Sequence, residues 1–508
     1  MAWGFSVVGA AFVNVIICMF ATFFFLKLRA GFNNKWAQAV LEIVLAGFLI
    51  SAVGTFAIVF LTPDQISEHV HYNISKEHIF MVLSTESLWH LFSLMGFLLL
   101  YRVGRRLGIL VGRYIDQPDA TGFLAMYFAV ATLISFFLPG GFYTSGFYET
   151  YIRGGEWANK TSDWQRVLIN IPSTVGFGAL LLLRFRYCSF GSQVRRNIGR
   201  ILTLLAMALV GWMSFIIGAR GFIIRALAVY WVYSRVSDKK VQQLLLPAGV
   251  VVASALIFLS LVAELRVHPI VVGGRLDVKM FTTVVKEQLR KVPLQNQIAM
   301  NVRYTILRFF PIEAGVFMQW VKSTGSYAGG TPLIGALFSI IPRSLWPDKP
   351  APGSVSPSVL DSPAWITGRI MGTPKVCRGT TPAASAFWIG GYPLVVISSF
   401  IVGGFMAFFI GLGQGAFFPA LLMFSILALS VGGPFLRISL PGLLLFVTRF
   451  LVPIGVMLVV WRIMKREFLP RREGFSSKNN RLKCAPREEP PGVLRLKAGK
   501  GPTERGAR

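Results

Sequence analysis

Residues 6–26 read SVVGAAFVNVIICMFATFFFL, an apolar run without a charged side chain that is about as long as one membrane crossing. Residues 1–5 contain no Lys or Arg, so the run lacks the basic region that opens a cleaved signal peptide. We therefore expect the segment to be retained. The whole chain agrees: 54% of its 508 residues are hydrophobic, 14% are charged, and the mean hydropathy is +0.60. Such a composition is too apolar for a soluble protein of this size.

Further windows of this kind recur along the chain, and together with the first they predict an all-α polytopic membrane protein with about eleven transmembrane helices. Eight spans fall in residues 1–263 and three in residues 386–463. The windows after the first lie at 38–62, 80–101, 121–139, 167–184, 201–217, 221–235, 243–263, 386–410, 416–431 and 443–463.

Basic residues in the short loops predict the orientation. They gather after the first, third, fifth and seventh windows, and the positive-inside rule places such loops in the cytoplasm. We therefore expect the N-terminus outside and the C-terminus in the cytoplasm. The residues are Lys27, Arg29, Lys35, Arg102, Arg105, Arg106, Arg113, Arg184, Arg186, Arg195, Arg196, Arg200, Arg235, Lys239 and Lys240, followed after the last window by Arg462, Lys465, Arg466, Arg471 and Arg472.

One long loop, residues 264–385, departs from this pattern. It holds fourteen Lys or Arg against six Asp or Glu and is predicted to lie outside the cytoplasm, which the rule for short loops allows. Amphipathic helices are expected near 279–291, 296–309 and 311–323. Its aromatic and apolar residues, among them Trp346 and Trp365, favour a folded cap over a disordered loop.

The C-terminal residues 464–508 are rich in Lys, Arg, Pro, Gly and Ser, a composition typical of a disordered cytoplasmic tail. The four cysteines, Cys18, Cys188, Cys377 and Cys484, are too dispersed to predict a disulfide. The net charge of +29 is compatible with nucleic acid, anionic lipid or phosphate as a partner. No nucleic-acid module, P-loop or metal-ligand spacing accompanies it, which argues against nucleic acid and predicts no metal or other cofactor.

Two groups of polar residues near the predicted outer surface are candidates for function. Arg220 lies in the hairpin Gly218-Ala219-Arg220-Gly221 between two short windows; an arginine that only snorkels to the surface is the simpler interpretation. The second group is Glu264, Arg266, His268 and Arg275, at the start of the basic loop. Arginine can hold a phosphate with two hydrogen bonds, and Glu or His can remove a proton from a hydroxyl. An ordinary charged segment beside the membrane would look the same.

A third group is the segment Ile341-Pro342-Arg343-Ser344-Leu345-Trp346-Pro347-Asp348-Lys349-Pro350, where prolines and a tryptophan stiffen the backbone around Arg343, Asp348 and Lys349. This segment resembles the Pro-Arg, Trp-Pro, Lys-Pro signature in the large periplasmic loop of the Wzy-type O-antigen polymerases, which join oligosaccharide repeat units in bacteria. The Arg220 hairpin is similar to a turn of the broader group that includes O-antigen ligases.

The resemblance implies a metal-independent glycosyltransferase with a GT-C-like helical bundle in the bacterial inner membrane. It would join repeat units carried on undecaprenyl diphosphate, as donor and as acceptor, into a surface polysaccharide on the periplasmic face. Besides membrane lipids, a chain-length regulator and a flippase are the partners this implies. Glu264, His268 and Asp348 become candidate bases, and the candidate diphosphate ligands are Arg220, Arg266, Arg275, Arg303, Arg343 and Lys349.

The chain departs from the family at residues 381–392, TPAASAFWIGGY, where polymerases of this kind often carry a glutamate. Two alternatives to a polymerase stay open. An O-antigen ligase shares the donor and the hydropathy plan, although ligases tend to lack the Trp-Pro-Asp-Lys-Pro segment. A polysaccharide exporter or lipid flippase is expected to show internal repeats and charged residues buried within the membrane. The span interiors carry few ionisable groups, namely Glu42, Glu86, His90, Arg225 and Arg449.

Overall fold

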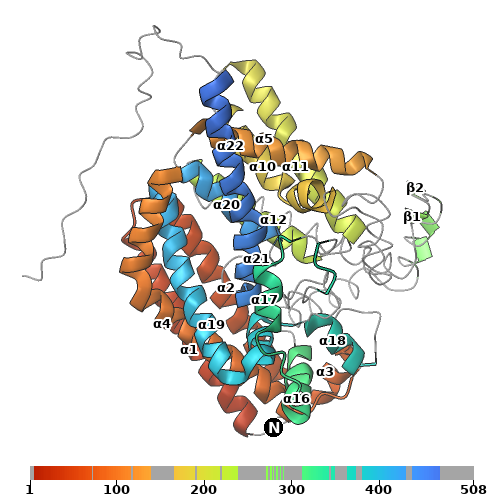
Figure 1. Ribbon diagram of the computed structural model, residues 1–508. Coiled ribbons are helices and arrows are strands. Elements are labelled where there is room, and N and C mark those ends of the chain that lie inside the picture. Colours follow the sequence, from red (N-terminus) through yellow and green to blue (C-terminus); the bar gives the residue numbers. More distant parts are fainter. Residues whose placement is uncertain are drawn as a thin grey trace, which may run out of the picture. The chain divides into compact units, whose positions relative to one another are not determined.

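Helices make up almost all of the described structure, a computed structural model (Figure 1). The structure describes residues 5–70, 72–115, 118–138, 165–188, 192–217, 220–237, 312–341, 345–348, 363–372, 380–430 and 437–468, with short pieces between 271 and 290. Residues up to Leu458 belong to one compact unit and residues 459–508 to another. The predicted window at 243–263, the predicted helix at 296–309 and the tail beyond 468 lie outside the described residues.

The helices of the N-terminal half are α1 (Phe5–Ala30), α2 (Lys35–Phe60), α3 (Pro63–Val70), α4 (Lys76–Ile115), α5 (Pro118–Phe137), α9 (Ile171–Ser173), α10 (Gly176–Leu183), α11 (Gln193–Ile217) and α12 (Arg220–Val236). Those of the C-terminal half are α16 (Glu313–Thr324), α17 (Thr331–Leu337), α18 (Pro363–Ile370), α19 (Pro382–Gly415), α20 (Phe417–Ser430), α21 (Leu440–Phe446) and α22 (Val452–Phe468). Three π-helical turns are η1 (Arg166–Asn170), η2 (Arg184–Cys188) and η4 (Val447–Leu451). An antiparallel pair of two-residue strands, β1 (Val271–Val272) and β2 (Arg275–Leu276), also lies within the described residues.

Five described helices are long and apolar enough to cross a membrane, so the chain is a helical membrane protein. They are Phe5–Ala30, Lys35–Phe60, Asp119–Phe137, Pro382–Gly415 and Leu440–Lys465. The other predicted windows that fall on described residues also coincide with helices. The total of about eleven spans stays a prediction, as does the side on which each loop lies.

The closest helix pair in the bundle is α4 with α19, which lie side by side over most of their length (Figure 1). Glycines on each helix face the backbone of the other. A Cβ on Gly96 or Gly108 would overlap the carbonyl oxygen of Phe400 or Phe408, and one on Gly411 would overlap that of Arg105. Small residues let membrane helices approach to backbone contact, where dispersion forces are strongest. Residue numbers at these contacts increase together on the two helices, from Gly96 with Phe400 to Gly108 with Phe408, so the helices run parallel.

Helices α1 and α2 complete a four-helix group around this pair. Phe25 of α1 packs against Phe97 of α4 and Phe48 of α2. The indole of Trp36 in α2 lies over Gly413 of α19 and donates to the Phe409 carbonyl at 3.3 Å. With the 3.0 Å contact between Asn14 of α1 and His90 of α4, these contacts place α1 parallel to α4 and α2 antiparallel to both.

A second group of helices, α5, α10, α11, α12 and α20, is held by contacts among small and hydroxyl residues. The buried Tyr233 hydroxyl in α12 donates to the Gly178 carbonyl of α10 at 3.1 Å and lies 3.1 Å from Ser425 Oγ of α20. The tight helical hairpin predicted between the windows 201–217 and 221–235 agrees with α11 ending at Ile217, α12 beginning at Arg220, and the two helices being in contact.

Helix α19 is broken near its start. Gly390 and Gly391 have non-helical backbone angles, and Gly391 has a φ of 67°, which only glycine adopts without strain. The break frees the Trp388 carbonyl, which accepts the backbone N–H of Ala328 from the long loop at 2.9 Å. A loop residue thus satisfies a backbone group that the helix itself cannot.

The described parts of the long loop include three helices in contact with the membrane helices. α16, as expected near 311–323, packs on α4 and α19 with Gly315 against the His78 carbonyl. α17 packs on α21, where Ser339 Oγ lies 2.8 Å from Thr448 Oγ1. α18 packs on α16. In the helix expected at 279–291, the described residues between 279 and 290 are helical and exposed. The part of the loop that is described is therefore folded.

The glycine contacts between α4 and α19 predict the effect of adding one methyl group. Gly108→Ala forces the two backbones apart, and overpacking of this kind costs about 1–3 kcal/mol. We expect a lower midpoint of thermal unfolding for the purified protein in detergent. Gly211→Ala in α11, where nothing lies within 4 Å of an added Cβ, is the control and should leave the midpoint unchanged or raise it. Equal midpoints for Gly108→Ala and the parent would contradict the close contact.

A second prediction concerns His78, at the start of α4. Its Nδ1 accepts the Ser75 backbone N–H at 3.0 Å, and burial lowers its pKa below the ordinary value of about 6.5, with Glu77 opposing. Protonation of Nδ1 removes this acceptor. Because the unfolded state binds the proton first, the stability from neutral His78 is present above about pH 6.5 and is lost as the pH falls towards the lowered pKa.

Hydrogen exchange of the peptide covering α16 measures this effect, after correction for the intrinsic pH dependence of exchange. We expect relatively faster exchange at pH 5.5 than at pH 7.5 in the parent and no such difference in His78→Gln. An identical pH response in the two proteins would assign it to another group.

Candidate functional site

Most residues that the sequence suggests for the site lie outside the described part of the chain. This holds for Glu264, Arg266, His268, Arg303, Arg343 and Lys349. Arg220 is the first residue of α12 and Arg275 lies in β2, but only their backbone positions are described. Their roles therefore stay predictions.

Asp348 is the one candidate whose side chain is described. It is exposed on a turn next to Trp346, whose ring packs against Phe338 at 5.8 Å. The stiff turn expected at 341–350 thus has an aromatic contact that anchors it to α17.

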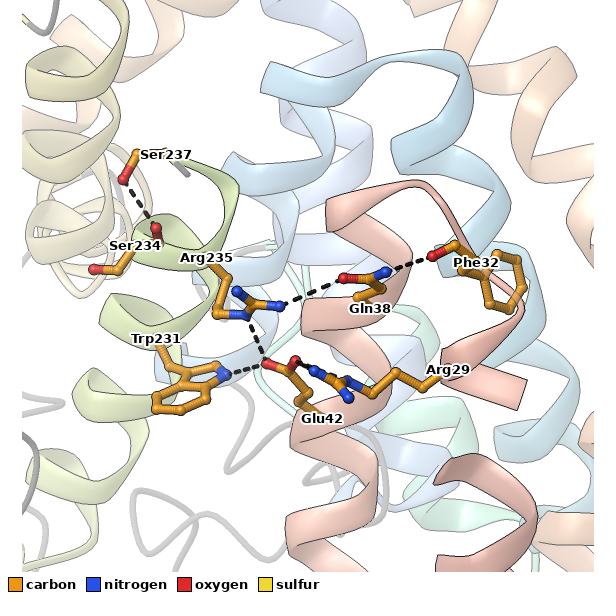
Figure 2. A network of polar contacts seen from close by, with 8 residues as sticks. All are labelled: Arg29, Phe32, Gln38, Glu42, Trp231, Ser234, Arg235 and Ser237. Atoms are coloured by element: carbon orange, nitrogen blue, oxygen red, sulfur yellow. Dashed lines mark hydrogen bonds and ion pairs between the residues drawn. The ribbon is translucent and has the colours of Figure 1, made fainter. Parts of the chain in front are cut away.

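The first polar cluster inside the bundle surrounds Glu42 of α2 (Figure 2). Arg29 of α1 pairs with Oε1 at 2.7 Å. Trp231 Nε1 of α12 donates to Oε2 at 2.7 Å and Arg235 Nε to the same oxygen at 3.1 Å. Arg235 also reaches Gln38, which in turn donates to the Phe32 carbonyl. Both carboxylate oxygens accept from donors of α1 and α12, so this cluster joins these two helices to α2 and offers no free acceptor.

The second polar cluster surrounds Glu86 of α4, and here one carboxylate oxygen lacks a donor among the described residues. Glu86 is 9% exposed, and its Oε1 is buried with no hydrogen-bond partner among the described residues. Its Oε2 lies 3.9 Å from Nε2 of His90, one turn further along the same helix. A buried carboxylate oxygen without a donor is costly, and in native proteins it calls for a functional explanation or a ligand.

Two further groups converge on Glu86 from other segments. Thr381, which caps the N-terminus of α19 by accepting the Ala384 N–H at 3.0 Å, has its hydroxyl within hydrogen-bonding reach of the carboxylate. Arg437, an exposed residue before α21, lies close enough to act electrostatically on both Glu86 and His90. Thr380 Oγ1, beside the cap, is also buried without a partner among the described residues.

Polar residues of α1 and α2 lie on the Nδ1 side of the His90 ring. Asn14 Oδ1 lies 3.0 Å from His90 Nδ1, and Asn14 Nδ2 donates to Thr55 Oγ1 at 2.7 Å. Cys18, a free and buried cysteine, has its sulfur 3.6 Å from His90 Nδ1. The cluster therefore combines a carboxylate, an imidazole and a cation near the broken start of α19, next to the loop helix α16.

Sequence reasoning noted Glu86 and His90 as ionisable but did not place them in the site. The missed signal is their spacing of four residues, which puts both on one helix face, together with the rarity of such residues in apolar spans. Glu86 is one of the few ionisable groups noted in the span interiors, and the structure shows it buried. Within the described ranges no three His, Cys, Asp or Glu side chains come close enough to hold a metal ion.

Comparison with known proteins adds no relative: no family model matches the chain, and neither a curated protein nor a solved structure is significantly similar to it. The fold and its apolar helices define a helical membrane protein. Any narrower assignment depends on the cluster around Glu86 and on the resemblance at residues 341–350.

The contrast between the two clusters predicts how substitutions around Glu42 behave. Glu42→Ala leaves Arg235 and Trp231 without their acceptor, and both lie in the bundle, whereas the Arg29 side chain is 31% exposed. We expect destabilisation in the order Glu42→Ala, then Arg235→Ala, then Arg29→Ala, with about 1–3 kcal/mol for the first. Thermal unfolding in detergent gives the order, and Arg29→Ala as the most damaging change would contradict the structural role.

Proposed function

We propose that this protein is a glycosyltransferase that joins oligosaccharide repeat units carried on undecaprenyl diphosphate, at the extracytoplasmic face of a bacterial inner membrane. The observation that carries the proposal is the buried Glu86 carboxylate oxygen of α4, which has no hydrogen-bond partner among the described residues and lies close to Arg437 and to the start of α19, the helix that follows the basic loop. The segment at 341–350 and the apolar bundle, suited to a polyprenyl tail, add support.

In this proposal the two charged groups have complementary roles. The reaction forms a bond from an acceptor hydroxyl oxygen to the anomeric carbon of the donor and breaks the bond from that carbon to the diphosphate. Glu86 accepts the hydroxyl proton, and Arg437 stabilises the negative charge on the departing diphosphate. Lys and Arg of the loop, including Arg343, provide further cations for the lipid diphosphate.

The proposal also accounts for the departure at residues 381–392, where the expected glutamate is missing. Thr381, at the start of that segment, lies beside Glu86, so a carboxylate is present at this place but comes from α4. In this proposal a glutamate has the same role as in the polymerases that the chain resembles, but it comes from another position in the chain.

A lipid-linked glycan transporter is the second candidate, and two observations favour it. Transporters bind substrate at discontinuous helices and at buried ionisable groups. Here α19 is broken at Gly390 and Gly391, and Glu86 and His90 are buried in the same bundle. The internal repeats typical of such proteins are not evident in the sequence.

Glycan analysis of a strain that lacks the gene separates the candidates. A polymerase is indicated when long chains disappear and single repeat units remain attached at the surface. Loss of all surface attachment with polymer retained on the lipid indicates a ligase. Loss of both polymer and single units, with lipid-linked units retained on the cytoplasmic side, indicates a transporter and would overturn the proposal.

Substitutions in the same strain test the site. General acid–base groups contribute about 10²–10⁴-fold to rate, so Glu86→Gln should reduce polymer formation at least about 100-fold. Arg437→Gln should reduce it similarly. Glu77→Gln, an exposed carboxylate on the same helix, is the matched control and should be fully active. Protein abundance in the membrane is measured alongside, and an active Glu86→Gln protein would remove this residue from the chemistry.

A further inference from the structure

The orientation of the Asn14 side chain determines the hydrogen-bonding state of His90. Asn14 Nδ2 donates to Thr55 Oγ1 at 2.7 Å, which turns the amide oxygen towards His90 and the Cys18 thiol. An amide oxygen only accepts hydrogen bonds. With the amide in this orientation, the 3.0 Å contact between Asn14 Oδ1 and His90 Nδ1 favours a proton on Nδ1.

With the proton on Nδ1, the lone pair of neutral His90 is on Nε2, and this atom faces Glu86. The separation between Nε2 and Glu86 Oε2 is 3.9 Å, slightly beyond a hydrogen bond. Catalytic contacts are often long before substrate binds and shorten when it does. A small rotation of either side chain brings Nε2 and the carboxylate within hydrogen-bonding distance, and the two acceptors bond when Glu86 has taken up a proton.

Polar and charged groups from three other segments face this pair. Cys18 of α1 lies beside Nδ1, Thr381 of α19 lies beside the Glu86 carboxylate, and Arg437 acts on both residues. Arg437 supports a negative Glu86 and opposes a second positive charge at His90. The pair is therefore suited to hold one proton between a carboxylate and an imidazole, rather than two.

We propose that Glu86 and His90 share a single transferable proton, and that Asn14 holds His90 as the Nδ1–H tautomer so that Nε2 receives it. The role of this proton in glycosyl transfer rests on the proposed function. The acceptor hydroxyl gives its proton to Glu86 as its oxygen bonds to the anomeric carbon, and the diphosphate leaves with the electron pair of the broken bond. The proton then passes from Glu86 to Nε2, which restores the carboxylate, and is finally released to solvent.

The structural half of the proposal can be tested without any activity. The chain has five histidines, so solid-state NMR of the full-length protein with ¹³C,¹⁵N-histidine in lipid bilayers is tractable. His90→Gln assigns the His90 signal; if that variant does not accumulate, substitution of the other four histidines assigns it instead. We expect the Nδ1–H tautomer in the parent and a shift towards the Nε2–H tautomer in Asn14→Leu. An Nε2–H tautomer in the parent would overturn the proposal.

The functional half uses polymer synthesis in membranes from the complemented deletion strain, with the strain's own lipid-linked repeat units. We expect His90→Gln to lower the rate at least about tenfold and to change its pH profile, with normal membrane abundance. A rate and pH profile equal to the parent, while Glu86→Gln is inactive, would refute proton sharing and leave the proposed function standing. Polymer synthesis that does not depend on the gene at all would refute the proposed function, and the NMR result would still decide the tautomer.

Discussion

The parallel contact between α4 and α19 is the constraint on which the other features depend. Lipid chains are as apolar as leucine side chains, so burial of apolar surface does little to bring membrane helices together. Gly96 and Gly108 on α4, and Gly403 and Gly411 on α19, replace that missing force with backbone contact over several turns. α1, α2 and α16 then pack against this pair, so their positions follow from it.

The same contact explains why the polar cluster forms where it does. The register of the two helices would bring residues near Tyr392 beside Glu86 if α19 were straight, since Ser93 meets Gly403 and Gly96 meets Phe400. Thr381 lies there instead. The break at Gly390 and Gly391 is what redirects the start of α19, and the loop residue Ala328 stabilises the break by binding the freed Trp388 carbonyl. The loop thereby contributes to the site through backbone geometry as well as through charge.

The sequence predicted the helical membrane class because hydropathy responds directly to the absence of water around a span. The predicted windows also lie close to the observed bounds of α1, α2 and α12, for the same reason. The meeting of Glu86 with Thr381 could not be predicted, because it depends on one helix contact and one break that join positions far apart in the chain. The exposure of Asp348 could not be predicted either, because a stiff turn gives no information about which way its side chains face. The loop candidates such as Arg343 stay predictions.

The two glutamates within the bundle show how hydrogen bonding separates structural from functional ionisable groups. Glu42 has donors on both oxygens from two other helices, which is the arrangement expected of a buried charge that only holds helices together. Glu86 keeps one oxygen without a donor among the described residues, although Thr381 and Arg437 already offset part of its desolvation. A fold selected for stability alone would replace such a group with an apolar residue, at a gain in stability. The retained carboxylate is therefore best explained by a ligand that supplies the missing donor, and a substrate hydroxyl is a donor of the required kind.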